Sequence, residues 1–145
     1  MANISLVPYL FFKGTAKEAM EFYKSVFGGE LVMSTLGESP KEVLEQMKVD
    51  ESRYGEIMHS HLKGGTFELL GSDSQMASDH SAKVELSING PSADEAKMRE
   101  MFDKLAEGGE VRMKLTAMPW GDIYGQITDK FNVDWMMDIG DSMSD

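Results

Sequence analysis

Two segments of the sequence match each other at an offset of 80 residues. They are Ala16–Met33 (AKEAMEFYKSVFGGELVM) and Ala96–Met113 (AKMREMFDKLAEGGEVRM), and eight of their 18 positions are identical, Phe22 and Phe102 among them. Each segment reads as an amphipathic helix, a Gly-Gly stop and a strand. A repeat of this length predicts two copies of one supersecondary module, and this constrains the fold more than any other feature.

The apolar patterns around the repeat predict one strand before each helix and three after it. Capping-box patterns (Ser/Thr-x-x-Glu) at Thr15, Ser39 and Ser92 predict helix starts, and Pro40–Met47 is expected to form a short additional helix. The strands are expected at Ile4–Phe12, Glu30–Thr35, Ile57–Leu62 and Thr66–Leu70, and then at Val84–Ile88, Glu110–Leu115, Ile123–Thr128 and Trp135–Ile139.

Composition excludes several classes of function. A net charge of −11 disfavours nucleic acid and anionic membrane surfaces, which need a basic face. The absence of cysteine excludes disulfides, thiolate metal sites and a cysteine nucleophile. The apolar run Leu6–Phe12 is too short to span a bilayer, and no basic segment precedes it as in a secretory signal. We therefore expect a cytoplasmic protein.

Short motifs follow one another in a fixed order from about residue 4 to residue 139. They are Pro8–Phe12, Ala19–Tyr23 leading to Phe27-Gly28, Met58-His59, Gly71–Asp73, Trp120–Gly125, and Asp129–Phe131 with Val133 and Trp135. In this order and spacing the chain resembles the PhnB-like proteins of the vicinal oxygen chelate superfamily, which includes glyoxalase I, bleomycin resistance proteins and extradiol dioxygenases. The resemblance implies two βαβββ modules, a curved mixed sheet with a shared cavity, and pairing into a homodimer.

Metal enzymes of that superfamily carry His or Glu ligands on the first and last strands of each module. By the resemblance, Pro8 and Met136 stand at two of these four positions, and neither binds a hard divalent metal. The other two positions fall at Lys83 or Val84 and at Glu68 or Leu69. We therefore predict no cofactor and no standard metal centre.

His59 and His61 offer an alternative metal set. Residues two apart on a strand point to one face, and Glu68 on the neighbouring strand could add a carboxylate. The simpler interpretation is that both are ordinary strand histidines. The direction in which this face points is left open.

The candidate ligand site comes from strand alternation. Ile123 and Ile127 should face a helix, which sends Tyr124 and Gln126 toward the cavity. Trp135, Met137 and Ile139 should likewise pack under a helix, while Met136 faces the cavity together with Leu6, Pro8, Leu10 and Phe12. The residues predicted to contact a ligand are Trp120, Tyr124, Gln126, Met136, Tyr9 and Phe12; no catalytic residue is assigned.

The sequence thus predicts an α+β fold in a single domain over residues 1–145. Module one spans about 4–72, a linker about 73–82, module two about 83–139, and an acidic tail 140–145. The first hypothesis for function is a small-molecule binding protein that uses no standard metal centre. A metal-dependent lyase, isomerase or dioxygenase built on His59, His61 and Glu68 is the second, and a structural or interaction module with a filled cavity is the third.

Overall fold

The computed structural model describes residues 5–74 and 84–141. The chain divides into two compact units, Met1–Ser78 and Asp79–Asp145, and we describe each by itself. Both units repeat the predicted order of one strand, one helix and three strands. The fold class is therefore confirmed as α+β, with a four-stranded mixed sheet in each unit.

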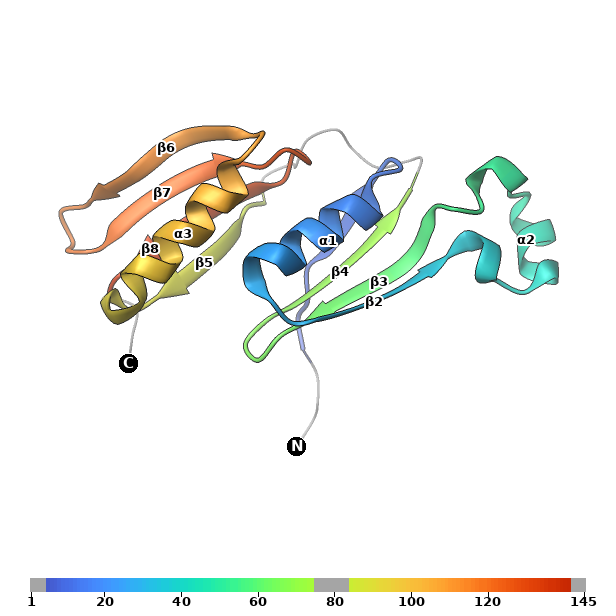
Figure 1. The fold of residues 1–145 in the computed structure, drawn as a ribbon, viewed down its shortest axis with the longest axis horizontal. Helices are drawn as coiled ribbons and strands as arrows, with labels where there is room; N and C mark the ends of the chain where they lie inside the picture. The colour runs from blue at the N-terminus through green and yellow to red at the C-terminus, as the bar shows by residue number, and fades with distance from the viewer. Residues whose placement is uncertain (1–4, 75–83, 142–145) are drawn as a thin grey trace. The chain divides into compact units, whose positions relative to one another are not determined.

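The first unit contains β1 (Tyr9–Phe12), α1 (Ala16–Phe27), β2 (Glu30–Thr35), β3 (Ile57–Lys63) and β4 (Glu68–Asp73). Its strands form the first sheet in the order β1-β4-β3-β2, with β1 parallel to β4 and the other pairs antiparallel. Helix α1 lies across one face of this sheet (Figure 1). Between β2 and β3 the chain forms two short 3-10 turns, Leu36–Glu38 and Glu51–Arg53, and the predicted short helix α2 (Lys41–Met47).

The second unit repeats this plan with β5 (Leu86–Gly90), α3 (Glu95–Ala106), β6 (Glu110–Ala117), β7 (Ile123–Thr128) and β8 (Asp134–Ile139). A 3-10 turn, Ser92–Asp94, precedes α3. The strands form the second sheet in the order β5-β8-β7-β6, again with only the first pair parallel, and α3 covers one face (Figure 1). We call the face of each sheet opposite its own helix the distal face.

The two helices are equivalent at an offset of 79 residues, which differs from the sequence match. Both have 12 residues, and they begin at 16 and 95, whereas the strands that follow begin at 30 and 110. One additional residue, Glu107, lies between α3 and its glycine pair. The residue that matches the buried Phe102 is therefore Tyr23, and Phe22 is only half-buried. The sequence match, which aligns Phe22 with Phe102 and so predicts that both are core residues, is wrong within the helix because it carries the offset of the glycines into it.

Side chains at the predicted capping boxes of Thr15 and Ser39 do not cap their helices. An aspartate at the end of the last strand of each unit, or just after it, instead accepts hydrogen bonds near the start of the unit's main helix. Thr15 and Ser39 make no side-chain cap to α1 or α2. Instead, Asp73 Oδ1 at the end of β4 accepts hydrogen bonds from the backbone N–H groups of Gly14 and Ala16, both at 2.9 Å. Asp141, just after β8, accepts from the Ser92 backbone and hydroxyl in the same way. The end of β4 thus fixes the start of α1, and the residue Asp141 after β8 fixes the 3-10 turn that leads into α3.

Several predictions about the domain organisation of the chain stay predictions. The single domain and the shared cavity depend on how the two units are placed, and stay predictions. The linker prediction falls mostly on residues 75–82, and the tail prediction on residues 142–145, outside the described residues; Asp73, taken as the first linker residue, instead ends β4. Within the described ranges, no helix is long and apolar enough to cross a membrane.

Candidate functional site

The predicted alternation along β7 and β8 is present in the structure. Ile127, Trp135, Met137 and Ile139 are each at most 3% exposed and lie on the α3 side of the second sheet. Gly125 also faces α3, because a side chain there would touch the Phe102 ring. The residues between them, Tyr124, Gln126 and Met136, therefore occupy the distal face, where they are half-buried.

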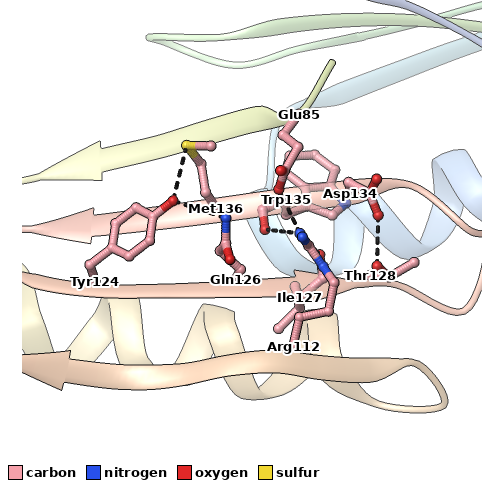
Figure 2. A network of polar contacts seen from close by, with 9 residues as sticks. All are labelled: Glu85, Arg112, Tyr124, Gln126, Ile127, Thr128, Asp134, Trp135 and Met136. Carbon is pink, nitrogen blue, oxygen red and sulfur yellow. Dashed lines mark hydrogen bonds and ion pairs between the residues drawn. The ribbon is translucent and has the colours of Figure 1, made fainter. Parts of the chain in front are cut away.

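Tyr124, Gln126 and Met136 form a small polar chain on this face, shown in Figure 2. The Gln126 Nε2 group donates a hydrogen bond to Tyr124 Oη at 3.1 Å. The Tyr124 hydroxyl in turn points at Met136 Sδ, 3.7 Å away. A thioether is a weak acceptor, so the hydroxyl proton can be offered to a better one. The chain thus combines an aromatic surface, a hydroxyl donor and an amide within two neighbouring strands.

Arg112 on β6 crosses the same face beside this chain (Figure 2). Its Nη2 atom donates to Glu85 Oε1 and to the carbonyl oxygens of Ile127 and Trp135, the last two at 3.1 and 3.4 Å. The hydrogen bond to Glu85 raises the pKa of the Arg112 guanidinium above its ordinary value. Because Glu85 already balances its charge, Arg112 joins three strands rather than offering a free cation.

Two carboxyl groups meet at the other end of the face. Asp138 lies directly across from Tyr124 on β7 and from Asn89 on β5. Its carboxyl group hydrogen-bonds to that of Asp122, which is 2% exposed. Burial, and then the contact with Asp122, raise the pKa of Asp138 from 3.8 to about 6. The pair therefore holds a proton at pH values where a solvated aspartate has lost it.

Because of this acid pair, we predict that the free energy of unfolding falls as pH rises. The folded pKa of Asp138 lies above its unfolded value, so its contribution is complete below about pH 4 and is lost as pH rises through about 6. Replacing Asp138 by asparagine should raise the free energy of unfolding at pH 7.5 by about 1–2 kcal/mol, allowing for solvent screening, and leave it nearly unchanged at pH 4. Urea titrations of both proteins across this range measure the difference. A loss of stability at pH 7.5 in the variant would contradict the shared proton.

Trp120 lies in the loop between β6 and β7, three residues before β7 begins, and its side chain is 56% exposed. The loop is a tight turn, in which Gly121 N–H donates to Met118 C=O and Met118 N–H donates to Asp122 C=O. Gly121 has a φ of 101°, a value that strongly favours glycine. The turn holds an exposed indole two residues from Asp122, which directly precedes β7.

The two remaining predicted ligand residues, Tyr9 and Phe12, lie on opposite faces of the first sheet. Tyr9 is 40% exposed on the distal face, where its Oη lies 3.3 Å from His59 Nδ1. Phe12 is 4% exposed on the opposite side of β1, so its predicted placement toward a ligand is wrong. The strand β1 begins only at Tyr9, and residues 5–8 before it are not in a strand. The alternation counted from the start of the apolar run therefore does not identify the distal face. Leu6, before the strand, is fully exposed.

The alternative metal set is only partly brought together. His61 Nε2 lies 2.8 Å from Glu68 Oε2, while His59 contacts Tyr9 instead. Among the residues that the structure describes, no group of three or more His, Asp or Glu side chains could hold a metal ion. Of the superfamily positions, Met136 points its thioether at the Tyr124 hydroxyl, and Pro8 has no side-chain donor. The side chains at these positions therefore do not fit the divalent cation that the superfamily implies.

Two acids, Asp129 and Asp73, have structural roles that the sequence did not predict. Asp129 lies in the turn between β7 and β8 and is 3% exposed, and its carboxylate accepts from Phe131 N–H, Val133 N–H and Trp135 Nε1–H. Asp73 accepts from Ile57 N–H in addition to its helix contacts. Both follow or end a strand, a position at which an acid is most often solvated. The pattern of the sequence therefore held no signal for the backbone and indole contacts of these two carboxylates.

A family model described as 3-demethylubiquinone-9 3-methyltransferase matches residues 4–137. A structure of protein PA1353 from Pseudomonas aeruginosa is 33% identical, with a TM-score of 0.82 over 95% of this chain and 98% of that one. The chain belongs to this family. A putative member from Bacillus cereus, also titled PhnB protein, is 25% identical, with a TM-score of 0.74 over 94% and 100% of the two chains. The name of this Bacillus cereus protein joins the family description to the PhnB-like proteins.

Two further comparisons agree with this assignment. Protein YjdN of Escherichia coli is 28% identical to this PhnB-like chain over 140 residues, which are 92% of this chain and 94% of YjdN. A lactoylglutathione lyase from Agrobacterium tumefaciens is 18% identical, with a TM-score of 0.54 over 99% and 98% of the two chains, and shares the fold alone. The PhnB-like chain thus has the vicinal oxygen chelate fold, and the fold leaves its activity open.

Proposed function

We propose that this PhnB-like protein binds a small, partly apolar molecule on the distal face of its second sheet. The observation that carries the proposal is the chain of Tyr124, Gln126 and Met136. The aromatic ring and the thioether offer apolar contact area, and the hydroxyl and the amide offer a few placed hydrogen bonds. Small-molecule sites commonly combine these features.

The charges on this face favour a neutral or basic ligand. Asp138 and Asp134 lie on it, and the Arg112 guanidinium is already paired with Glu85. An anionic ligand would meet carboxylates and no unpaired cation among these residues. Trp120 is proposed to cover the ligand from the neighbouring turn, since a large exposed indole is costly to leave in water.

Two variants separate binding from stability. A thermal-shift screen of a compound library first supplies a binder, so the natural ligand need not be known. Replacing Tyr124 by alanine should then raise the Kd of that compound about tenfold or more, equivalent to ~1.4 kcal/mol or more, because the ring and hydroxyl are both lost. The free energy of unfolding of the Tyr124→Ala variant should be only about 1 kcal/mol below that of the wild-type protein, since the Tyr124 side chain is half-buried.

The matched variant is Ile127→Ala, one residue beyond Gln126 on the same strand. Ile127 is 1% exposed under α3, so its truncation should cost ~2–5 kcal/mol of stability. Binding to the remaining folded protein should be nearly unchanged. Equal destabilisation by both variants, with binding unaffected in Tyr124→Ala, would mean that the proposed face does not bind the compound.

The homodimer and the cytoplasmic location are part of this proposal. Pairing is supported by the PhnB-like resemblance, and the location by the absence of cysteine and by the acidic composition.

A further inference from the structure

The distal face of the first sheet carries two polar pairs, each built on a histidine of β3. His61 Nε2 lies 2.8 Å from Glu68 Oε2, and His59 Nδ1 lies 3.3 Å from Tyr9 Oη. These four side chains are not used in the function proposed above. They come from three strands, β1, β3 and β4, and the register of those strands puts them on one face.

The first pair has the arrangement of a general base. Because a carboxylate only accepts hydrogen bonds, Glu68 fixes the neutral His61 ring with its proton on Nε2. The lone pair is then on Nδ1, the atom that Glu68 does not contact. The side chains of His61 and Glu68 are 35% and 32% exposed, so small molecules can reach the ring. A carboxylate that orients and stabilises a histidine serves the same purpose in many acid–base sites.

An apolar surface adjoins this base. Tyr9 and Phe11 stack with ring centroids 4.8 Å apart and planes 9° from parallel. Tyr9 and His61 both lie directly opposite Leu70, one on each side of it. Since neighbouring strands are about 4.8 Å apart, the backbones of Tyr9 and His61 are separated by roughly 10 Å, with Leu70 between them.

We propose that this face is a general-base site, in which Nδ1 of His61 removes a proton from a planar, uncharged compound that lies over Leu70 against Tyr9. The substrate class is a small aromatic or conjugated molecule with an acidic C–H bond. Glu68 stabilises the imidazolium that forms.

Nitrobenzisoxazole is a suitable probe because it is planar, uncharged and opened by a base alone. The proton moves from its ring carbon to Nδ1 of His61, and the C–H electron pair becomes part of the new nitrile triple bond. The N–O bond breaks, and its electron pair leaves on the oxygen of a coloured nitrophenolate. His61 then releases the proton to water, so the reaction consumes no oxidant or reductant.

The test compares His61→Gln with His80→Gln, which changes the third histidine of the chain. Positioned general bases contribute about 10²–10⁴-fold, so His61→Gln should lower kcat/KM for the probe at least tenfold, while His80→Gln should leave it unchanged. Glu68→Gln should give a smaller loss, because the amide still orients the ring but carries no charge. If His61→Gln keeps more than half of the wild-type rate, or if both histidine variants lose equally, the proposal is overturned.

A second measurement needs no variant of the base itself. Nitrogen NMR of the wild-type protein, at a pH at which the His61 ring is uncharged, should show the ring proton on Nε2 and the lone pair on Nδ1. A proton on Nδ1 would place the lone pair against Glu68 and overturn the proposal even if the His61 variant fails to fold. A wild-type rate no faster than that of free imidazole at the same concentration would overturn it as well.

Discussion

Replacing Asp129 by alanine is expected to lower the free energy of unfolding by ~3–5 kcal/mol, because three donors lose a buried charged acceptor. The carboxylate accepts from Phe131 N–H at 2.8 Å, from Val133 N–H at 3.1 Å and from Trp135 Nε1–H at 2.8 Å. It therefore joins the turn between β7 and β8 to the indole beneath α3. A domain of this size has ~5–15 kcal/mol in total, so the variant should lose between about a fifth and all of its stability. Urea denaturation at neutral pH measures the loss.

The control is Asp103→Ala, the same change at an exposed position on α3. Surface changes of this kind usually stay within about 0.5 kcal/mol. If Asp129→Ala is also within this range, the turn must keep its structure without the carboxylate, and the network around Trp135 has no importance for stability.

Truncating Phe102 or Tyr23 to alanine is expected to cost ~3–5 kcal/mol each, the usual loss for a large core ring. Phe102 is 5% exposed and Tyr23 is fully buried, and the two are equivalent at the structural offset of 79 residues. Phe22→Ala should cost less than about 2 kcal/mol, because its ring is only half-buried and leaves a smaller cavity. Denaturation of the three variants under one set of conditions gives the ranking.

Phe22 serves as the internal control, since it neighbours Tyr23 and its ring touches that of Tyr23 with centroids 5.7 Å apart. Equal losses at Phe22 and Phe102, with a small loss at Tyr23, would restore the offset of 80 residues. That result would mean that α1 presents a different face to its sheet.

Much of the fold could be predicted from the sequence because it is repeated. The double glycine marks the same boundary twice, and alternation from Ile123 to Ile139 gives the faces of β7 and β8 correctly. These signals are local: a strand or helix with one buried face must carry the matching period. Where a run is apolar on both faces, as in Leu6–Phe12, the period is lost and the face of Phe12 was predicted wrongly.

The site was less accessible to sequence reasoning because its contacts join residues far apart in the chain. Arg112 meets Glu85 across the whole second sheet, and Asp73 caps a helix that begins 57 residues earlier. Neither partner is visible in a local pattern. The pairing of His61 with Glu68 was accessible, since both lie near one hairpin, whereas the contact of His59 with Tyr9 was not.

An NMR titration with the screened compound shows whether the distal face of the second sheet binds a small molecule. On addition of the compound, the largest shifts in the amide spectrum are expected at Tyr124, Gln126 and Met136, together with the indole N–H of Trp120. Residues of α3 that face away from the sheet, such as Asp103, should not move. Saturable shifts confined to positions outside β7, β8 and the Trp120 turn would contradict the claim.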